Sequence, residues 1–83
     1  MTFRIVATPG ASREFDRLPE TTRKRFLAAF DRLEAGLAGL DVAALQGAPG
    51  SFRLRVGRYR GIYRLEPGVI VFTRFGHRST VYR

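Results

Sequence analysis

Arginines at alternating positions are the side chains of this sequence best suited to chemistry. Arg53 and Arg55 alternate with apolar residues in the stretch Phe52–Val56, and residues spaced in this way project from one face of a β-strand. Arg60 and Arg64 share one face of the stretch that follows. A guanidinium group offers phosphate a fork of donors and stays charged at any working pH. The spacing therefore predicts a surface that holds phosphate groups.

Nearly all of the net charge of +8 comes from the C-terminal part of the chain. Residues 1–46 carry seven basic and six acidic side chains, whereas residues 52–83 carry eight arginines and the single acid Glu66. Clustered cations repel one another, so folding alone does not explain them, and a phosphate backbone is the commonest partner that does. The alternative is a solvated polar face of an antiparallel sheet, but such faces usually mix signs and this one is expected to hold no acid. The eight are Arg53, Arg55, Arg58, Arg60, Arg64, Arg74, Arg78 and Arg83.

The other candidate residues lie close to the C-terminus. His77 and Arg78 follow Gly76, and Tyr82 comes four residues after Arg78. A single histidine, no cysteine and acids placed mostly on helices argue against a metal site or Ser-His-Asp hydrolysis, and no cofactor is expected. The residues that remain can hold phosphates, neutralise charge at phosphorus and stack a base on Tyr82. This inventory fits metal-free RNA cleavage, in which the substrate's own 2′-OH attacks the neighbouring phosphate.

His77 has two interpretations. It is the one side chain of the sequence that normally titrates near neutrality, so it could transfer a proton during cleavage. It could also be a hydrogen-bonded turn residue that orients the end of the chain, and we favour this interpretation. Arginine stabilises charge but cannot accept a proton. We therefore expect catalysis by positioning and arginine electrostatics, without a dedicated protein base.

The length of 83 residues predicts one small domain over residues 1–83. The sequence has no cysteine, which suits a reducing cytoplasm. No apolar run approaches the roughly 20 residues that span a bilayer, and the N-terminus lacks the apolar region of a signal peptide. We therefore expect a cytoplasmic protein without a membrane partner.

The N-terminal half predicts a strand and two helices. Thr2–Thr8 alternates like a strand, and Thr8-Pro9 resembles an N-cap followed by a proline at the first helical position. A short helix should end at Pro19, and a second should run from about 20 to 35. Their apolar faces are expected to form the core. The faces comprise Ala11, Phe15 and Leu18 in the first helix, and Phe26, Phe30, Leu33 and Leu37, with Leu27 beside them, in the second.

The C-terminal half predicts an antiparallel sheet. Residues 36–50 are rich in glycine and indicate a connection, with one helical turn near 42–45. Strands are expected over 52–56, 59–65 and 69–75, the last being the most apolar and central, and a short strand could follow over 79–83. The expected fold is α+β in the order β-α-α-β-β-β(-β), with the N-terminal strand and both helices on one face of the sheet.

Three motifs resemble those of the RelE/ParE superfamily of bacterial toxins. Residues 52–64 resemble the central signature of the superfamily, and Leu45-Gln46-Gly47 resembles the Leu-x-Gly step ahead of it. Residues 76–82 resemble the closing motif Gly-His-Arg-x-x-Val-Tyr. The order of strand, two helices and sheet agrees over nearly the whole chain, so the resemblance implies a RelE-like fold. The longer motifs are FRLRVGRYRGIYR at 52–64 and GHRSTVY at 76–82.

The resemblance to the RelE-type nucleases implies roles for five residues. Arg53 and Arg55 stand where that branch places two basic residues, usually lysines, near the scissile phosphate. Arg60 stands where an arginine stabilises the transition-state phosphate. Arg78 stands where an arginine assists the leaving 5′ oxygen, and Tyr82 where a tyrosine stacks on an mRNA base.

The resemblance also implies partners and leaves rival activities open. A RelE-like toxin cuts mRNA in the ribosomal A site and is neutralised by an acidic, RelB-like antitoxin, with the toxin a monomer inside a hetero-oligomeric complex. Arg58 and Arg64 are further candidates for binding the RNA backbone. The rivals are a ParE-like inhibitor of DNA gyrase without nuclease activity and a degenerate, non-toxic RNA-binding member. The basic or aromatic character of the five positions favours the nuclease.

Overall fold

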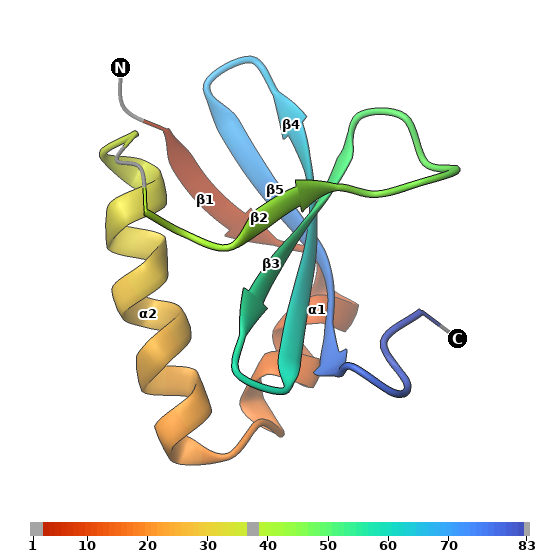
Figure 1. The fold of residues 1–83 in the computed structure, drawn as a ribbon. Helices are drawn as coiled ribbons and strands as arrows, with labels where there is room; N and C mark the ends of the chain where they lie inside the picture. The colour runs from red at the N-terminus through yellow and green to blue at the C-terminus, as the bar shows by residue number, and fades with distance from the viewer. Residues whose placement is uncertain (1–2, 37–38, 83) are drawn as a thin grey trace.

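Two helices cover one face of a five-stranded sheet in the computed structural model, which describes residues 3–36 and 39–82 (Figure 1). The observed order is β-α-α followed by four strands, and the predicted α+β fold is confirmed. The elements are β1 (Arg4–Ala7), α1 (Pro9–Asp16), α2 (Glu20–Glu34), β2 (Val42–Ala44), β3 (Ser51–Val56), β4 (Tyr59–Glu66) and β5 (Val69–His77). Neither helix in the described ranges is long and apolar enough to cross a membrane.

The helix boundaries follow from the expected capping residues. The Thr8 hydroxyl accepts a hydrogen bond from the Ala11 amide at 3.2 Å, and Pro9 occupies the first turn of α1. Pro19 precedes the first residue of α2. The predicted apolar faces pack into the core, with Leu27 more than half exposed and Leu37 outside the described residues. The helices therefore form from local signals and are held by burial of one stripe each.

The sheet is mixed rather than antiparallel as expected. Its strand order is β1-β5-β4-β3-β2, and β1 runs parallel to β5. The two helices carry the chain from β1 across the sheet to β2 at the opposite edge, and the antiparallel strands that follow bring β5 back beside β1. Residues 69–75 were expected to form the central strand. They lie in β5, which is an interior strand beside the middle strand β4.

Two predicted local elements were wrong. Residues 42–44 form β2 instead of a helical turn, because they pair with β3 from Val42↔Leu54 to Ala44↔Phe52, whereas an isolated turn gains few hydrogen bonds. Residues 78–82 form turns instead of a strand, and Arg83 lies outside the described residues. The amides of Thr80 and Val81 both donate to the His77 carbonyl at 2.9 Å, which folds the chain back on itself.

An irregularity in β5 keeps two phenylalanines in the core. Phe72 pairs with Tyr63 and Arg74 with Ile62, so Thr73 is an extra residue in the ladder. The bulge lets Phe72 and Phe75, three residues apart, point to the same face, where their rings stack at 4.9 Å. Without it, period-two alternation would turn Arg74 toward the helices. The bulge therefore places Arg74 and Gly76 on the open face.

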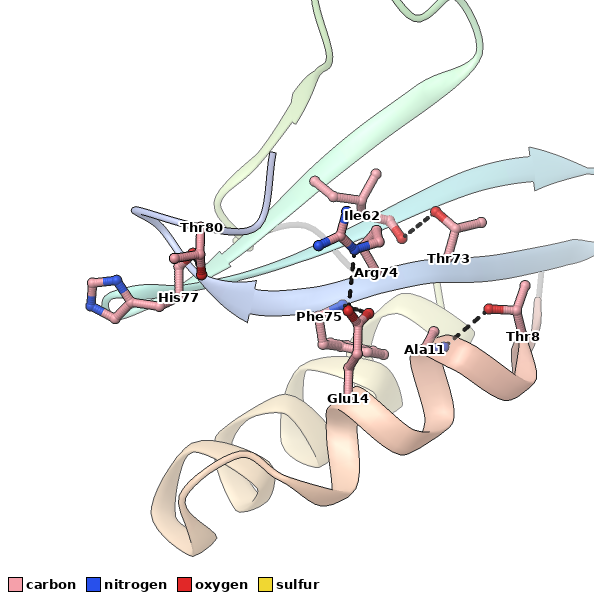
Figure 2. Close-up of polar contacts among 9 residues, drawn as sticks. All are labelled: Thr8, Ala11, Glu14, Ile62, Thr73, Arg74, Phe75, His77 and Thr80. Atoms are coloured by element: carbon pink, nitrogen blue, oxygen red, sulfur yellow. Dashed lines mark hydrogen bonds and ion pairs between the residues drawn. The ribbon is translucent and has the colours of Figure 1, made fainter. Parts of the chain in front are cut away.

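Glu14 of α1 completes the outer edge of β5 beyond the end of β1. Its carboxylate accepts a hydrogen bond from the Phe75 amide at 3.1 Å and forms an ion pair with Arg74 at 3.2 Å (Figure 2). An unpaired strand amide in this position would carry a desolvation cost. The carboxylate satisfies the amide and ties α1 to the strand that leads into the C-terminal motif.

Gly61 provides a prediction of stability. A Cβ atom at this position would lie 2.8 Å from one ring atom of Phe72 and 3.0 Å from one of Phe75. Gly61→Ala should therefore lower the free energy of unfolding in urea by about 1–3 kcal/mol through overpacking. Gly10→Ala is the matched control, since its new methyl group meets nothing closer than 4.0 Å. Equal stability of the two variants would show that the aromatic core accommodates the methyl group.

Candidate functional site

Arg53, Arg55 and Arg60 lie together on the face of the sheet that the helices leave open. The register places Arg55 directly opposite Arg60 across β3 and β4. The intervening residues Leu54 and Val56 belong to the core on the helix side. The placement predicted from alternation is therefore confirmed, and these three arginines are called the arginine face below. Like charges directly opposite each other on neighbouring strands destabilise a sheet, so folding does not account for the arrangement.

Arg60 is buried, with 9% of its surface exposed, and is the one buried charged residue in the described ranges. Its Nη1 atom donates to the carbonyl oxygens of Gly57 at 3.1 Å and Tyr59 at 3.0 Å. No described carboxylate pairs with it. Its burial distinguishes Arg60 from Arg55 on the neighbouring strand, whose side chain is about half exposed.

The charges around Arg60 show which residues gather there. Burial lowers the pKa of Arg60, and the positive charges of Arg55, Arg53 and Arg78 lower it further. Tyr82 acts on the pKa in the opposite direction. The structure therefore brings the candidates from β3, β4 and the C-terminus around one guanidinium group. A buried cation without a carboxylate, surrounded by further cations, is an arrangement suited to an anion.

The turn at residues 78–82, called the C-terminal turn below, carries Arg78 and Tyr82. Val81 is buried and packs on Gly76, which pairs with Arg60 on the open face. The Arg78 amide donates to the Arg58 carbonyl at 2.8 Å, which ties the turn to the β3–β4 hairpin. Figure 1 shows this segment on the side of the sheet away from α2. Tyr82 is 54% exposed, so its ring is available for stacking.

His77 lies on the opposite face from Arg60. It pairs with Tyr59, whose ring packs against the core and contacts the imidazole edge-on at 5.4 Å. Its Nδ1 atom accepts a hydrogen bond from the Ser79 amide at 3.2 Å and lies 2.8 Å from the Ser79 hydroxyl. An amide can only donate, so this contact fixes Nδ1 as the acceptor. In Figure 2 the ring projects beyond the end of β5, away from Arg74.

Arg58 and Arg64 occupy different surroundings. Arg58 is exposed in the β3–β4 turn beside the C-terminal turn. Arg64 is four residues beyond Arg60 on β4, near the far end of the hairpin, and forms an ion pair with Glu66 at 2.9 Å. Arg58 therefore borders the arginine face, while Arg64 is engaged elsewhere.

Asp41 corrects the expectation that this face holds no acid. It immediately precedes β2, and its carboxylate lies 3.1 Å from Arg55 Nε and 3.9 Å from Arg53 Nη1. Its carbonyl also accepts the Arg55 amide at 2.9 Å. Sequence reasoning missed Asp41 because it missed β2. The signal was the short apolar run Val42–Ala44 after an acid, at a spacing that pairs with β3.

Among the solved structures, several toxin–antitoxin proteins share this fold. A chain of the RelB–RelE antitoxin–toxin complex from Methanococcus jannaschii superposes with a TM-score of 0.82 at 22% identity, covering 93% of this chain and 94% of that one. A chain of the RelE–RelB complex from Pyrococcus horikoshii gives 0.75 at 28% identity, covering 98% and 100%. A chain of the DinJ–YafQ complex from E. coli gives 0.80 at 15% identity, covering 100% of both.

Sequence comparison adds the family. No curated protein sequence matches the chain. The family model described as the ParE toxin of type II toxin-antitoxin system, parDE, matches residues 5–82. This range includes all of the sheet except Arg4, the first residue of β1, together with both helices, the arginine face and the C-terminal turn. The chain therefore belongs to the ParE toxin family of type II toxin–antitoxin systems.

Proposed function

We propose that this toxin is a metal-independent endoribonuclease that cuts mRNA in the ribosomal A site, in the cytoplasm, and so arrests translation. The observation that carries the proposal is Arg60, a buried guanidinium without a carboxylate and with Arg53, Arg55, Arg78 and Tyr82 around it. A phosphate held there would compensate the buried charge. The substrate's 2′-OH would attack that phosphate and displace the 5′ oxygen of the next nucleotide, leaving a 2′,3′-cyclic phosphate. The hydroxyl would lose its proton to water and the leaving 5′ oxygen would take one up, while the arginines stabilise the charge that develops at phosphorus.

A second candidate function is inhibition of DNA gyrase without nuclease activity. The matched family model is named for ParE, and this favours the gyrase inhibitor. The presence of both Arg78 and Tyr82 beside Arg60 favours the nuclease, because a binding poison has no need of groups for a leaving oxygen and a stacked base. Primer extension on an mRNA after induction separates the two, since the gyrase inhibitor would produce DNA breaks with intact transcripts.

Arg60 provides the direct test of cleavage. Arg60→Gln should lower the rate of single-turnover cleavage on programmed ribosomes by at least about a hundredfold, because it removes a preorganised cation at the reacting phosphate. The free energy of unfolding should change by no more than about 1 kcal/mol, since relief of buried charge offsets the two lost hydrogen bonds.

Arg64→Gln is the matched control for this test. It removes the same charge from the same strand, but at a position paired with Glu66 and away from Arg60. Its cleavage rate should stay within about fivefold of wild type. If the two variants lose activity equally, the effect comes from overall charge, and if Arg60→Gln unfolds, the arginine holds the fold instead.

His77 should act by positioning the C-terminal turn and not as a base. His77→Asn keeps an acceptor near the position of Nδ1 for the Ser79 amide, whereas His77→Ala removes it. The cleavage rate of His77→Asn should remain within about tenfold of wild type, with a pH–rate profile of the same shape. His77→Ala should be slower because Arg78 and Tyr82 lose their support. An acid limb seen in wild type and absent from both variants, with equally large rate losses, would make His77 the base.

The proposed partner is an acidic, RelB-like antitoxin that covers the arginine face. The similar chains from M. jannaschii and P. horikoshii come from toxin–antitoxin complexes, and a surface this basic favours an acidic segment. The proposed complex is hetero-oligomeric, with one toxin monomer bound through its exposed cations.

Co-expression tests this partner. The adjacent open reading frame should encode an acidic protein that restores growth when it is expressed together with the toxin. Replacing the acidic residues of that protein's segment with neutral ones should restore the toxicity of the chain. If expression of the chain alone is harmless and the adjacent open reading frame encodes no acidic protein, both the proposed partner and the toxin activity are contradicted.

A further inference from the structure

Asp41 is the one acid that contacts the arginine face within the described ranges. Its two carboxylate oxygens reach different arginines, with Oδ2 at 3.1 Å from Arg55 Nε and Oδ1 at 3.9 Å from Arg53 Nη1. The arginines are two residues apart on β3 and project from the same face. The carboxylate therefore sits between them, where a phosphate oxygen bound by both would also have to lie.

The exposure of this contact makes the carboxylate replaceable. Asp41 is 49% exposed and Arg55 52% exposed, and ion pairs between groups this accessible contribute little to stability. Its shorter contact uses only Nε of Arg55, whereas a phosphate can take two parallel donors from a guanidinium group. A phosphate group can therefore exchange with Asp41 at a small cost to the fold.

The other acid–arginine pairs of the sheet differ in their surroundings. Glu14 also accepts the Phe75 amide, so its carboxylate completes a strand edge. Glu66 pairs with Arg64 near the distal end of the hairpin, away from Arg60. The Asp41 carboxylate, in contrast, contacts two arginines of the arginine face. Its position is set independently, because the bond from the Arg55 amide to its carbonyl belongs to the backbone.

We infer that Asp41 is a built-in competitor for phosphate, which holds Arg53 and Arg55 until a nucleic-acid strand displaces it. The inference rests on the proposed function, because it assumes that the arginine face binds a phosphate backbone. Asp41 would lower the affinity for any polyanion that engages only Arg53 and Arg55. A strand that also reaches Arg60 and Tyr82 would meet the same penalty, but its additional contacts would offset it. Asp41 would thus keep weakly held polyanions from occupying the site, while a correctly seated strand still binds.

The test measures binding of a labelled 12-nucleotide deoxyuridylate to the full chain by fluorescence anisotropy over a range of salt concentrations. This probe has no 2′-OH, so the proposed reaction cannot consume it. Asp41→Asn should bind about two- to fivefold more tightly at low salt than the control variant. The slope of log affinity against log salt should steepen by about 0.7, as expected for one additional phosphate contact.

Glu66→Gln is the matched control. It removes one negative charge from a carboxylate of nearly the same exposure, 47% against 49%, that also pairs with an arginine Nε. Its salt slope should equal that of wild type. In an Arg53→Ala/Arg55→Ala background, Asp41→Asn should no longer steepen the slope, because the arginines that it would release are absent.

The possible outcomes separate the inference from the proposed function. If wild type binds the probe with a salt-dependent affinity but Asp41→Asn behaves like Glu66→Gln, the competitor role is wrong and the proposed function stands. If Asp41→Asn binds more weakly, Asp41 orients the arginines instead of occupying them. Failure of wild type to bind at all would overturn both. Unfolding of both Asp41→Asn and Asp41→Ser would show that the carboxylate is structural, which also contradicts the inference.

Discussion

The stacking of Phe72 on Phe75 beneath Gly61 is the contact on which the rest of the structure depends. The two rings lie 4.9 Å apart, and Phe26 of α2 meets Phe75 edge-on at 5.3 Å. These contacts join β4, β5 and α2 in one aromatic core that excludes a side chain at Gly61. Burial and ring contacts of this kind supply several kcal/mol. The core can therefore hold β3 and β4 together although Arg55 and Arg60 repel each other across them.

The division of the sheet into two faces explains how one small domain carries both a core and a charged site. The helix side holds the aromatic core, while the open side concentrates cations whose exposed ion pairs contribute little to stability. Arg60 lies at the boundary, since it is buried yet belongs to the open side. Its desolvation is a stability cost that an anion would repay. At Arg60, the burial that lowers the stability of the fold is thus the same feature that favours binding of an anion.

The sequence was informative wherever structure follows from local chemistry. The cap at Thr8, the helix break at Pro19 and the alternation through Phe52–Val56 correctly predicted both helices and the arginine face. The parallel pairing of β1 depends on contacts between distant segments, and neither local propensity nor periodicity encodes it. The bulge at Thr73 and the strand β2 also depend on a neighbouring ladder. Asp41 and the burial of Arg60 were missed for the same reason, because the residues concerned are far apart in the chain.

The C-terminal turn makes assembly of the site an equilibrium of its own. Its described backbone contacts run to His77 and Arg58, and Val81 is its one buried side chain, so it can open without disturbing the aromatic core. Opening would move Arg78 and Tyr82 away from Arg60 while Arg53 and Arg55 stay in place. The apparent affinity for a ligand that needs all five residues then equals the intrinsic affinity multiplied by the closed fraction. Substitutions under the turn would change this fraction, and with it the strength of the whole site, without touching a single residue that contacts the ligand.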